Sequence, residues 1–230
     1  MERLRITSPE DLLLLAEICW QRGALVRYER LRGAEARVVI RGYRAIITVP
    51  DAYEGVGRQR FDVAHELGHV ELHRDLIAGA ICTSQDLNGY SRGSKQTLEH
   101  EANDFAAELL LPERFVGARC REAEPSLDFA AEVAGSFQVS LTAAAMRLVE
   151  FSAEPCLLVY SQGDHIRWCK RSREAEDMNL FPAVGDCLDR NTIAASYFRG
   201  AGKREVPGRV SVSAWFPGTE CRDGTRISEQ

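Results

Sequence analysis

The feature that most constrains this chain is a pair of histidines four residues apart, in the run His65-Glu66-Leu67-Gly68-His69. Residues 58–74 carry apolar side chains at helical spacing, so the run is predicted to lie within a helix. Because positions i and i+4 share one face of a helix, both imidazoles can reach one metal ion. Glu66 points away from the metal axis, yet lies near enough to act on a water molecule at the ion. The pattern therefore predicts a metal site suited to hydrolysis.

Zinc is the metal that this ligand set favours. Imidazole nitrogen is a borderline donor, and zinc accepts tetrahedral sets of nitrogen and oxygen ligands without redox chemistry. A catalytic zinc site uses three protein ligands and keeps one position open, so a third ligand is required. In the competing interpretation, His65 and His69 are packed core histidines or pair with acids. We expect one Zn²⁺ per chain, because the spacing and the helical context occur together.

A third ligand further along the same helix is disfavoured. The pattern HExxHxxGxxH would place glycine at Leu72 and histidine at Asp75. Asp75 could still bind a metal, but Leu72 removes the glycine that lets the chain turn back. His73 lies one helical turn beyond His69, too far along the helix to bind the same ion as His65 and His69. We interpret His73 and His100 as ordinary surface or rim histidines.

The third ligand is expected on a second amphipathic helix, over residues 95–111. Its buried face is marked by Leu98, Ala102, Phe105 and Leu109. At about 100° per residue, Glu99 lies about 60° from the centre of this face, and Glu101 about 100° away on the other side. We therefore prefer Glu99 as the ligand and assign Glu101 to the solvated face. Asn103, one turn after Glu99, is placed to accept the free N–H of a ligating histidine through its side-chain carbonyl.

The charge balance argues against a nucleic-acid-binding chain. The sequence holds 29 basic and 34 acidic side chains, for a net charge of −5. DNA binding needs a basic footprint, and no part of the chain is strongly basic. No apolar run approaches the ~20 residues of a membrane span, and the N-terminus lacks a signal peptide. We expect a cytoplasmic protein, not associated with membranes, in which most of the seven cysteines are small buried hydrophobes.

The remaining pattern predicts an α+β chain. A capped first helix over residues 8–23 presents a buried stripe, formed by Leu12, Leu15, Cys19 and Trp20. Residues 36–40 and 45–49 are strands around a tight turn, and residues 25–28 are a further candidate. A small, mainly antiparallel sheet would pack on the HExxH helix and the second ligand-bearing helix. Two short helices over residues 126–151, a hairpin over residues 156–169 and a strand over residues 210–216 complete the prediction.

Two stretches of sequence, residues 60–69 and residues 99–112, carry a family resemblance. The second is Glu99-His100-Glu101-Ala102-Asn103-Asp104-Phe105-Ala106-Ala107-Glu108-Leu109-Leu110-Leu111-Pro112. With the HExxH run, it resembles the ImmA/IrrE family of metallopeptidases, whose second motif has the form E-x-x-A-(N/D)-x-F-A-x-x-L-L-x-P. The family's glutamate maps onto Glu99. The resemblance implies a gluzincin-like site in which His65, His69 and Glu99 hold zinc and Glu66 is the catalytic base.

The resemblance also implies a biological setting. Typical members are cytoplasmic zinc endopeptidases of bacteria or phages that cleave a helix-turn-helix repressor and so induce stress or mobile-element genes. A protein substrate of this kind is the expected partner. Hydrolysis of an amide passes through an oxyanion that needs a donor beyond the metal, and Tyr90, His100 and Tyr53 are candidates among which the sequence does not choose.

Three domains are expected: a metallopeptidase domain over residues 1–120, a helical module similar to a helix-turn-helix over 121–153, and a β-rich region over 154–230. The last region is weakly similar to part of a GAF-type sensor domain. The helical module is too acidic for a DNA reader, so packing or substrate docking is preferred. Two alternatives stay open: a non-catalytic regulatory or anti-repressor binding protein, and a DNA-binding transcription factor with an accidental HExxH. Intact Glu66 argues against the first, and the acidic balance against the second.

Overall fold

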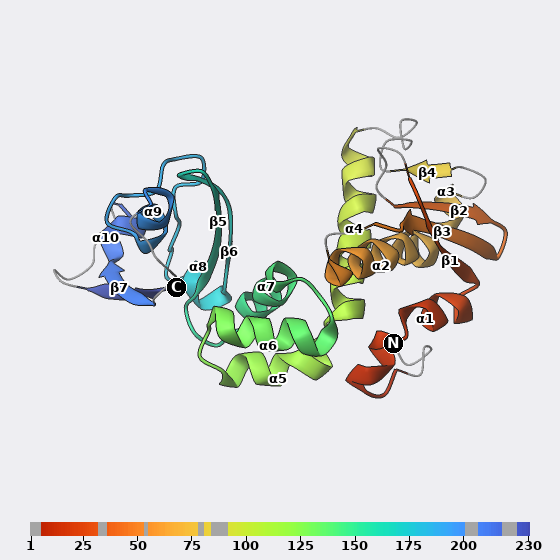
Figure 1. Ribbon diagram of the computed structural model, residues 1–230, viewed down its shortest axis with the longest axis horizontal. Helices are drawn as coiled ribbons and strands as arrows, with labels where there is room; N and C mark the ends of the chain where they lie inside the picture. The colour runs from red at the N-terminus through yellow and green to blue at the C-terminus, as the bar shows by residue number, and fades with distance from the viewer. Residues whose placement is uncertain are drawn as a thin grey trace. The chain divides into compact units, whose positions relative to one another are not determined.

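The computed structural model describes residues 6–31, 36–52, 55–77, 81–83, 92–200, 207–217 and 225–230, of which residues 77, 81–83 and 92–96 are described by their backbone alone. These residues form an α+β structure, which confirms the predicted fold class (Figure 1). The chain divides into two compact units: Met1–Val116 with Glu132–Ala144, and Gly117–Ala131 with Ala145–Gln230. The three-domain division at residues 120 and 153 stays a prediction. None of the described helices is long and apolar enough to cross a membrane.

The first unit contains a four-stranded sheet in the order β1-β3-β2-β4. Its strands are β1 (Ala24–Glu29), β2 (Arg37–Arg41), β3 (Arg44–Pro50) and β4 (Ile81–Thr83). The predicted hairpin is confirmed: β2 and β3 are antiparallel, with Arg41 opposite Arg44. β1 runs parallel to β3. After β1 the chain forms β2 and then reverses direction into β3, which lies between β1 and β2 in the sheet. The sheet is therefore mixed, with β4 antiparallel to β2.

The helix α2 (Val56–Leu72) contacts β2 and β3 in the first unit (Figure 1). Its apolar side chains Val63, Leu67 and Val70 are buried, as the helical spacing predicts. The helix α4 (Arg92–Leu110) packs against α2. A Cβ atom on Gly68 would lie 3.1 Å from the Cα atom of Ala102, so the two helices approach each other closely at this glycine.

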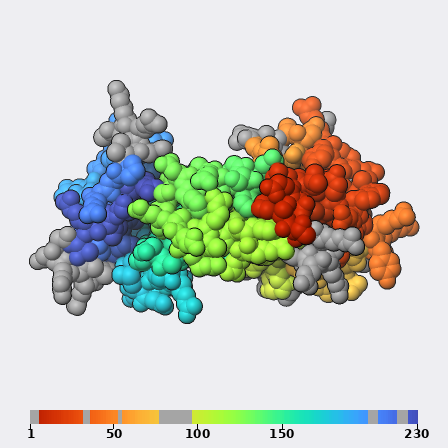
Figure 2. Space-filling model, turned by 90° about the horizontal axis from the view of Figure 1, so that it is seen from below, coloured from red at the N-terminus to blue at the C-terminus, as the bar shows by residue number. Residues whose placement is uncertain are grey.

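The N-terminal helix is broken into two parts. A 3₁₀ helix (η2, Pro9–Leu13) precedes α1 (Leu15–Gln21), and the carboxylate of Asp11 accepts hydrogen bonds from the backbone amides before η2. The predicted stripe is correct except at Trp20, which is 70% exposed. Ile18 is buried instead, because it lies three residues after Leu15 on the same face of α1. The segment formed by η2 and α1, drawn in red, lies at the surface of the first unit (Figure 2).

The predicted pair of helices after residue 126 is confirmed. They are α6 (Leu127–Phe137) and α7 (Leu141–Phe151). Ser126 and Ser140 cap them by accepting hydrogen bonds from backbone amides three residues ahead, at 3.1 Å in each case. Two further helices, α3 (Arg74–Ile77) and α5 (Glu113–Glu122), were not predicted.

From residue 156 onward, the described residues of the second unit form two separate two-stranded sheets and three short helices. Its elements are β5 (Leu157–Gln162), β6 (His165–Arg171), α8 (Arg173–Asp177), α9 (Ile193–Phe198), β7 (Gly208–Ser211), α10 (Val212–Trp215) and β8 (Arg226–Glu229). The hairpin β5-β6 is confirmed. The strand predicted over residues 210–216 is wrong beyond Ser211, where the chain turns into α10. Val212 and Phe216 are both buried, and their i, i+4 spacing places them on one face of a helical turn.

Candidate metal centre

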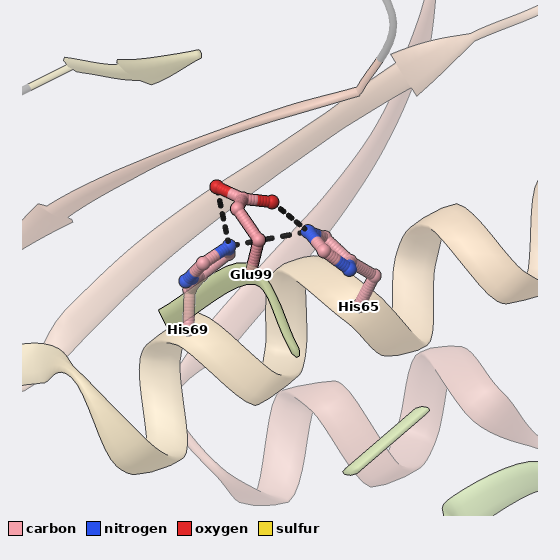
Figure 3. Close-up of side chains that lie close together, drawn as sticks. All are labelled: His65, His69 and Glu99. Carbon is pink, nitrogen blue, oxygen red and sulfur yellow. Dashed lines mark hydrogen bonds and ion pairs between the residues drawn. The ribbon is translucent and has the colours of Figure 1, made fainter. Parts of the chain in front are cut away.

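The side chains of His65, His69 and Glu99 converge between α2 and α4 (Figure 3). The Nε2 atoms of the two histidines are 3.1 Å apart. The two carboxylate oxygens of Glu99 lie 3.2 Å from Nε2 of His65 and 3.7 Å from Nε2 of His69. Ligand atoms that share a tetrahedral zinc ion lie roughly 3.3–3.6 Å apart. The spacing of these three side chains fits a single ion of that size.

Asn103 fixes the orientation of His65. Its side-chain oxygen lies 2.9 Å from Nδ1 of His65. An amide oxygen only accepts hydrogen bonds, so Nδ1 of His65 carries the proton. Nε2 then keeps its lone pair, and this is the atom that faces Glu99. Asn103 thus occupies the supporting position that the helical spacing predicted for it.

A second hydrogen-bonded series fixes the orientation of His69. Nδ1 of His69 lies 2.9 Å from Nδ1 of His73, and Nε2 of His73 lies 2.8 Å from a carboxylate oxygen of Glu101. The Glu101 carboxylate accepts, so Nε2 of His73 carries a proton and Nδ1 of neutral His73 accepts in turn. Nδ1 of His69 is therefore the donor, and its Nε2 keeps the lone pair. Two imidazole lone pairs and a carboxylate meet at one point, and the natural complement of such a group is a cation.

The surroundings shift the pKa values of the three residues in different directions. Burial lowers the pKa of His69. Burial also opposes protonation of His65, but the hydrogen bond to Glu99 and the charges of Glu66 and Glu99 outweigh it and raise the pKa of His65. Interactions with His65 and His69 hold the pKa of Glu99 well below its usual range. Glu99 is thus an anion at neutral pH, as a ligating carboxylate must be.

Glu66 is buried, at 6% exposure, between the two histidines on α2. Its negative charge acts on His65, so its carboxylate lies close to the convergent group. A carboxylate next to a metal centre can take a proton from a water molecule, which is the role predicted for Glu66.

The other residues that the sequence analysis considered for the site have different outcomes. Tyr53 and Tyr90 lie outside the described residues, and His100 is exposed on α4. The assignment of His73 to the surface is wrong: it is 2% exposed and bonded to His69. Glu101 is half exposed, in keeping with a solvated face, but its bond to His73 was missed. The signal was the stripe of histidines at positions 65, 69 and 73, each one helical turn after the last.

An HExxH helix beside a second helix whose carboxylate converges on both histidines, on a small α+β scaffold, is suited to a metallopeptidase centre. Comparison with known proteins agrees. The chain belongs to the peptidase family described by the IrrE N-terminal-like domain, whose model matches residues 19–149. The match includes all three convergent residues, and a metallopeptidase family implies a bound metal.

A curated relative is similar to part of the chain. It is metallopeptidase ImmA of Bacillus subtilis (strain 168), which is 36% identical over 63 residues. The aligned region is 27% of this chain and 34% of that protein, so the chain matches about a third of the relative's length.

Proposed function

We propose that this protein is a zinc-dependent endopeptidase in which His65, His69 and Glu99 hold the ion and Glu66 is the catalytic base. The observation that carries the proposal is the convergence of three ligand atoms at 3.1–3.7 Å, with the far side of each imidazole held by its own partner. Zinc, when bound there, would polarise the scissile carbonyl and lower the pKa of water. Family membership supports a peptidase, and the donor set of two imidazoles and a carboxylate favours zinc.

The protein side of the mechanism follows from the positions of these residues. Glu66 takes a proton from the attacking water and passes it to the leaving amine nitrogen. Burial of Glu66 strengthens its interaction with nearby positive charge. Asn103 and His73 keep the two imidazoles in one tautomer and one orientation, so that no reorganisation is needed when substrate binds.

The proposed substrate is a helix-turn-helix repressor, cleaved in the cytoplasm so that stress or mobile-element genes are expressed. This part of the proposal rests on the resemblance of residues 60–69 and 99–112 to the ImmA/IrrE family and on the match to the family model. The relative named above is a metallopeptidase, which supports the reaction class.

The test is to incubate the purified full chain with the helix-turn-helix protein encoded nearest to it and to follow cleavage on a gel. Wild type should cut, a zinc chelator should stop the reaction, and added Zn²⁺ should restore it. Glu66→Gln should bind the repressor without cutting it. If wild type with a full complement of zinc binds the repressor tightly but never cuts it, the protein is instead a non-catalytic regulator.

A further inference from the structure

A second group of metal-ligand side chains lies in the second unit, outside the residues that the family model matches. Its members are Asp164, His165 and Cys187, and one ligand atom from each lies within 4.8 Å of the others. All three side chains are exposed. A cluster of surface carboxylates offers only oxygen donors. This group also offers a thiolate and an imidazole, and these two donors together favour ions of the zinc class.

The backbone holds the two parts of this group in register. His165 begins β6, and Cys187 pairs with it through an isolated antiparallel bridge. The amide of Leu188 donates to the carbonyl of Asp164 at 2.7 Å, and the amide of Ile166 donates to the carbonyl of Asp186 at 3.0 Å. The segment that carries Cys187 is therefore bonded to the hairpin on both sides of the group.

Burial of the neighbouring residues explains why the group faces outward. Ile166 and Leu188 are buried and belong to one apolar cluster with Ala195. Successive side chains of extended backbone point to opposite faces. With Ile166 and Leu188 turned inward, His165 and Cys187 are turned to solvent, next to each other. The apolar cluster thus positions both donors before any ion binds.

The spacing of the donors matches a shared ion. The Sγ atom of Cys187 lies 3.4 Å from Nε2 of His165. A thiolate and an imidazole that bind one tetrahedral zinc ion lie roughly 3.5 Å apart. A carboxylate oxygen of Asp164 lies 2.7 Å from the other ring nitrogen, Nδ1 of His165, and the carboxylate adds a negative charge within 4.8 Å of the sulfur.

The same three residue types can also form a nucleophilic relay, in which the acid orients the histidine and the histidine activates the thiol. A relay places the acid at one ring nitrogen and the thiol at the other, and the contacts of Asp164 with Nδ1 and of Cys187 with Nε2 follow that order. The carboxylate oxygen and the thiol sulfur nevertheless lie within 4.8 Å of each other, whereas in-plane hydrogen bonds to the two ring nitrogens would hold them further apart, and this favours a common ion.

We propose that Asp164, His165 and Cys187 form a second metal site, which binds a divalent ion of the zinc class through sulfur, nitrogen and oxygen and leaves one position open to solvent. The site is independent of the HExxH centre in sequence and in ligand chemistry. It gives the second unit a thiolate whose reactivity depends on metal occupancy.

Cobalt(II) titration of the metal-free full chain tests the proposal. A thiolate bound to Co²⁺ gives a charge-transfer absorption in the near ultraviolet, and the His65, His69 and Glu99 group contains no thiol. The band should appear in wild type and persist in His69→Ala, where the first centre is disabled. It should disappear in Cys187→Ser and His165→Ala. Loss of the carboxylate in Asp164→Asn should weaken Co²⁺ binding roughly tenfold or more.

Matched variants control for unspecific effects. Cys169→Ser alters a free cysteine of the same hairpin, and Asp186→Asn alters an exposed acid next to Cys187 that is not part of the group. Both should keep the band at wild-type strength. Absence of the band in wild type, or its persistence in Cys187→Ser, would overturn the proposal.

Alkylation of Cys187, located by mass spectrometry, separates a metal site from a relay. Zinc should protect Cys187 in wild type and in His69→Ala. If Zn²⁺ gives no protection while alkylation slows in His165→Ala and Asp164→Asn, the group is a relay and not a metal site. Both readouts are independent of peptidase activity, so a failure here leaves the proposed function untouched, and the reverse also holds.

Discussion

His73 is hydrogen-bonded to His69, with the Nδ1 atoms of the two rings 2.9 Å apart, and its Nε2 atom is hydrogen-bonded to the carboxylate of Glu101. This series runs from a half-exposed acid, through a fully buried imidazole, to a proposed metal ligand. Groups that orient a ligating histidine commonly contribute 10–100-fold to metal affinity. The relationship makes His73 a positioning residue for His69.

We expect His73→Leu to weaken zinc binding about 10–100-fold, because leucine fills the space but cannot accept the proton of His69. His73→Gln, whose amide oxygen can accept, should recover part of the loss. Competition with a chromophoric chelator measures the zinc affinity, and denaturant unfolding of the metal-free chain measures stability separately. The matched control is His100→Leu, at an exposed position of α4. Unchanged zinc affinity in His73→Leu would show that His69 needs no such support.

Glu99→Gln should weaken zinc binding far more than Glu101→Gln. Glu99 contacts both histidines directly, whereas Glu101 contacts only His73 and is 51% exposed. We expect Glu101→Gln to lose less than about tenfold, at the lower edge of the range for groups that act through a ligand. Metal content after dialysis, with affinities measured by competition, gives the ranking. A larger loss in Glu101→Gln would move the third ligand to that position.

The Glu66→Gln variant should retain zinc but lose peptide hydrolysis. Glutamine preserves size and hydrogen bonding but cannot accept the proton, so hydrolysis should fall by at least ~10²-fold. Zinc content and unfolding midpoint should match wild type, because Glu66 is not one of the convergent ligands. Hydrolysis at the wild-type rate, with zinc bound, would exclude Glu66 as the base.

Gly68→Ala should destabilise the chain, although alanine is the better helix former. The added Cβ would lie 3.1 Å from the Cα atom and 3.2 Å from the carbonyl oxygen of Ala102, and both are backbone atoms of α4. Overpacking costs about 1–3 kcal/mol, against a helix-propensity gain of about 1 kcal/mol. Gly135→Ala is the control, because its Cβ would meet nothing within 4 Å, and it should stabilise the chain by about 0.5–1 kcal/mol. Denaturant unfolding measures both, and equal stabilisation by the two substitutions would contradict the close approach.

Acid should destabilise the metal-free chain through Glu99. Its pKa is lowered by folding from an unfolded value near 4.5, so the folded state favours the ionised form. The stability that this contributes is complete above the unfolded pKa and is lost as the pH falls below it. Glu99→Gln should therefore flatten the dependence of unfolding free energy on pH below about 4.5, whereas wild type should lose stability there. Parallel pH curves for the two proteins would contradict a depressed pKa at Glu99.

Helical spacing was enough to predict which face of α2 and which face of α4 carry the residues of the group. His65 and His69 share a face because four residues make about one turn, and the rotation of Glu99 from the buried face of α4 predicted its direction correctly (Figure 3). The contact of Asn103 with a histidine was predicted from the same helical-wheel argument. These predictions depend on geometry within one helix, which sequence encodes directly.

The parts that could not be predicted depend on contacts between elements. The stripe of histidines within α2 indicates that His73 lies next to His69, but the contact of His73 with Glu101 depends on how α4 packs against α2. The parallel pairing of β1 depends on where the hairpin inserts, and not on the residues of β1. The turn into α10 occurs in a short apolar run that suits either a strand or a helical turn.

The contact of Gly68 with α4 has a consequence for the choice of ion. At Gly68 the helix α2, which carries His65 and His69, approaches α4, which carries Glu99, so closely that an added Cβ atom would lie 3.1 Å from a backbone atom of α4. Zinc holds its nitrogen and oxygen ligands at about 2.0–2.2 Å, whereas calcium holds oxygen ligands at about 2.3–2.6 Å. A larger residue at position 68 would move the helix that carries Glu99 away from His65 and His69, and we expect this to weaken the binding of a zinc-sized ion.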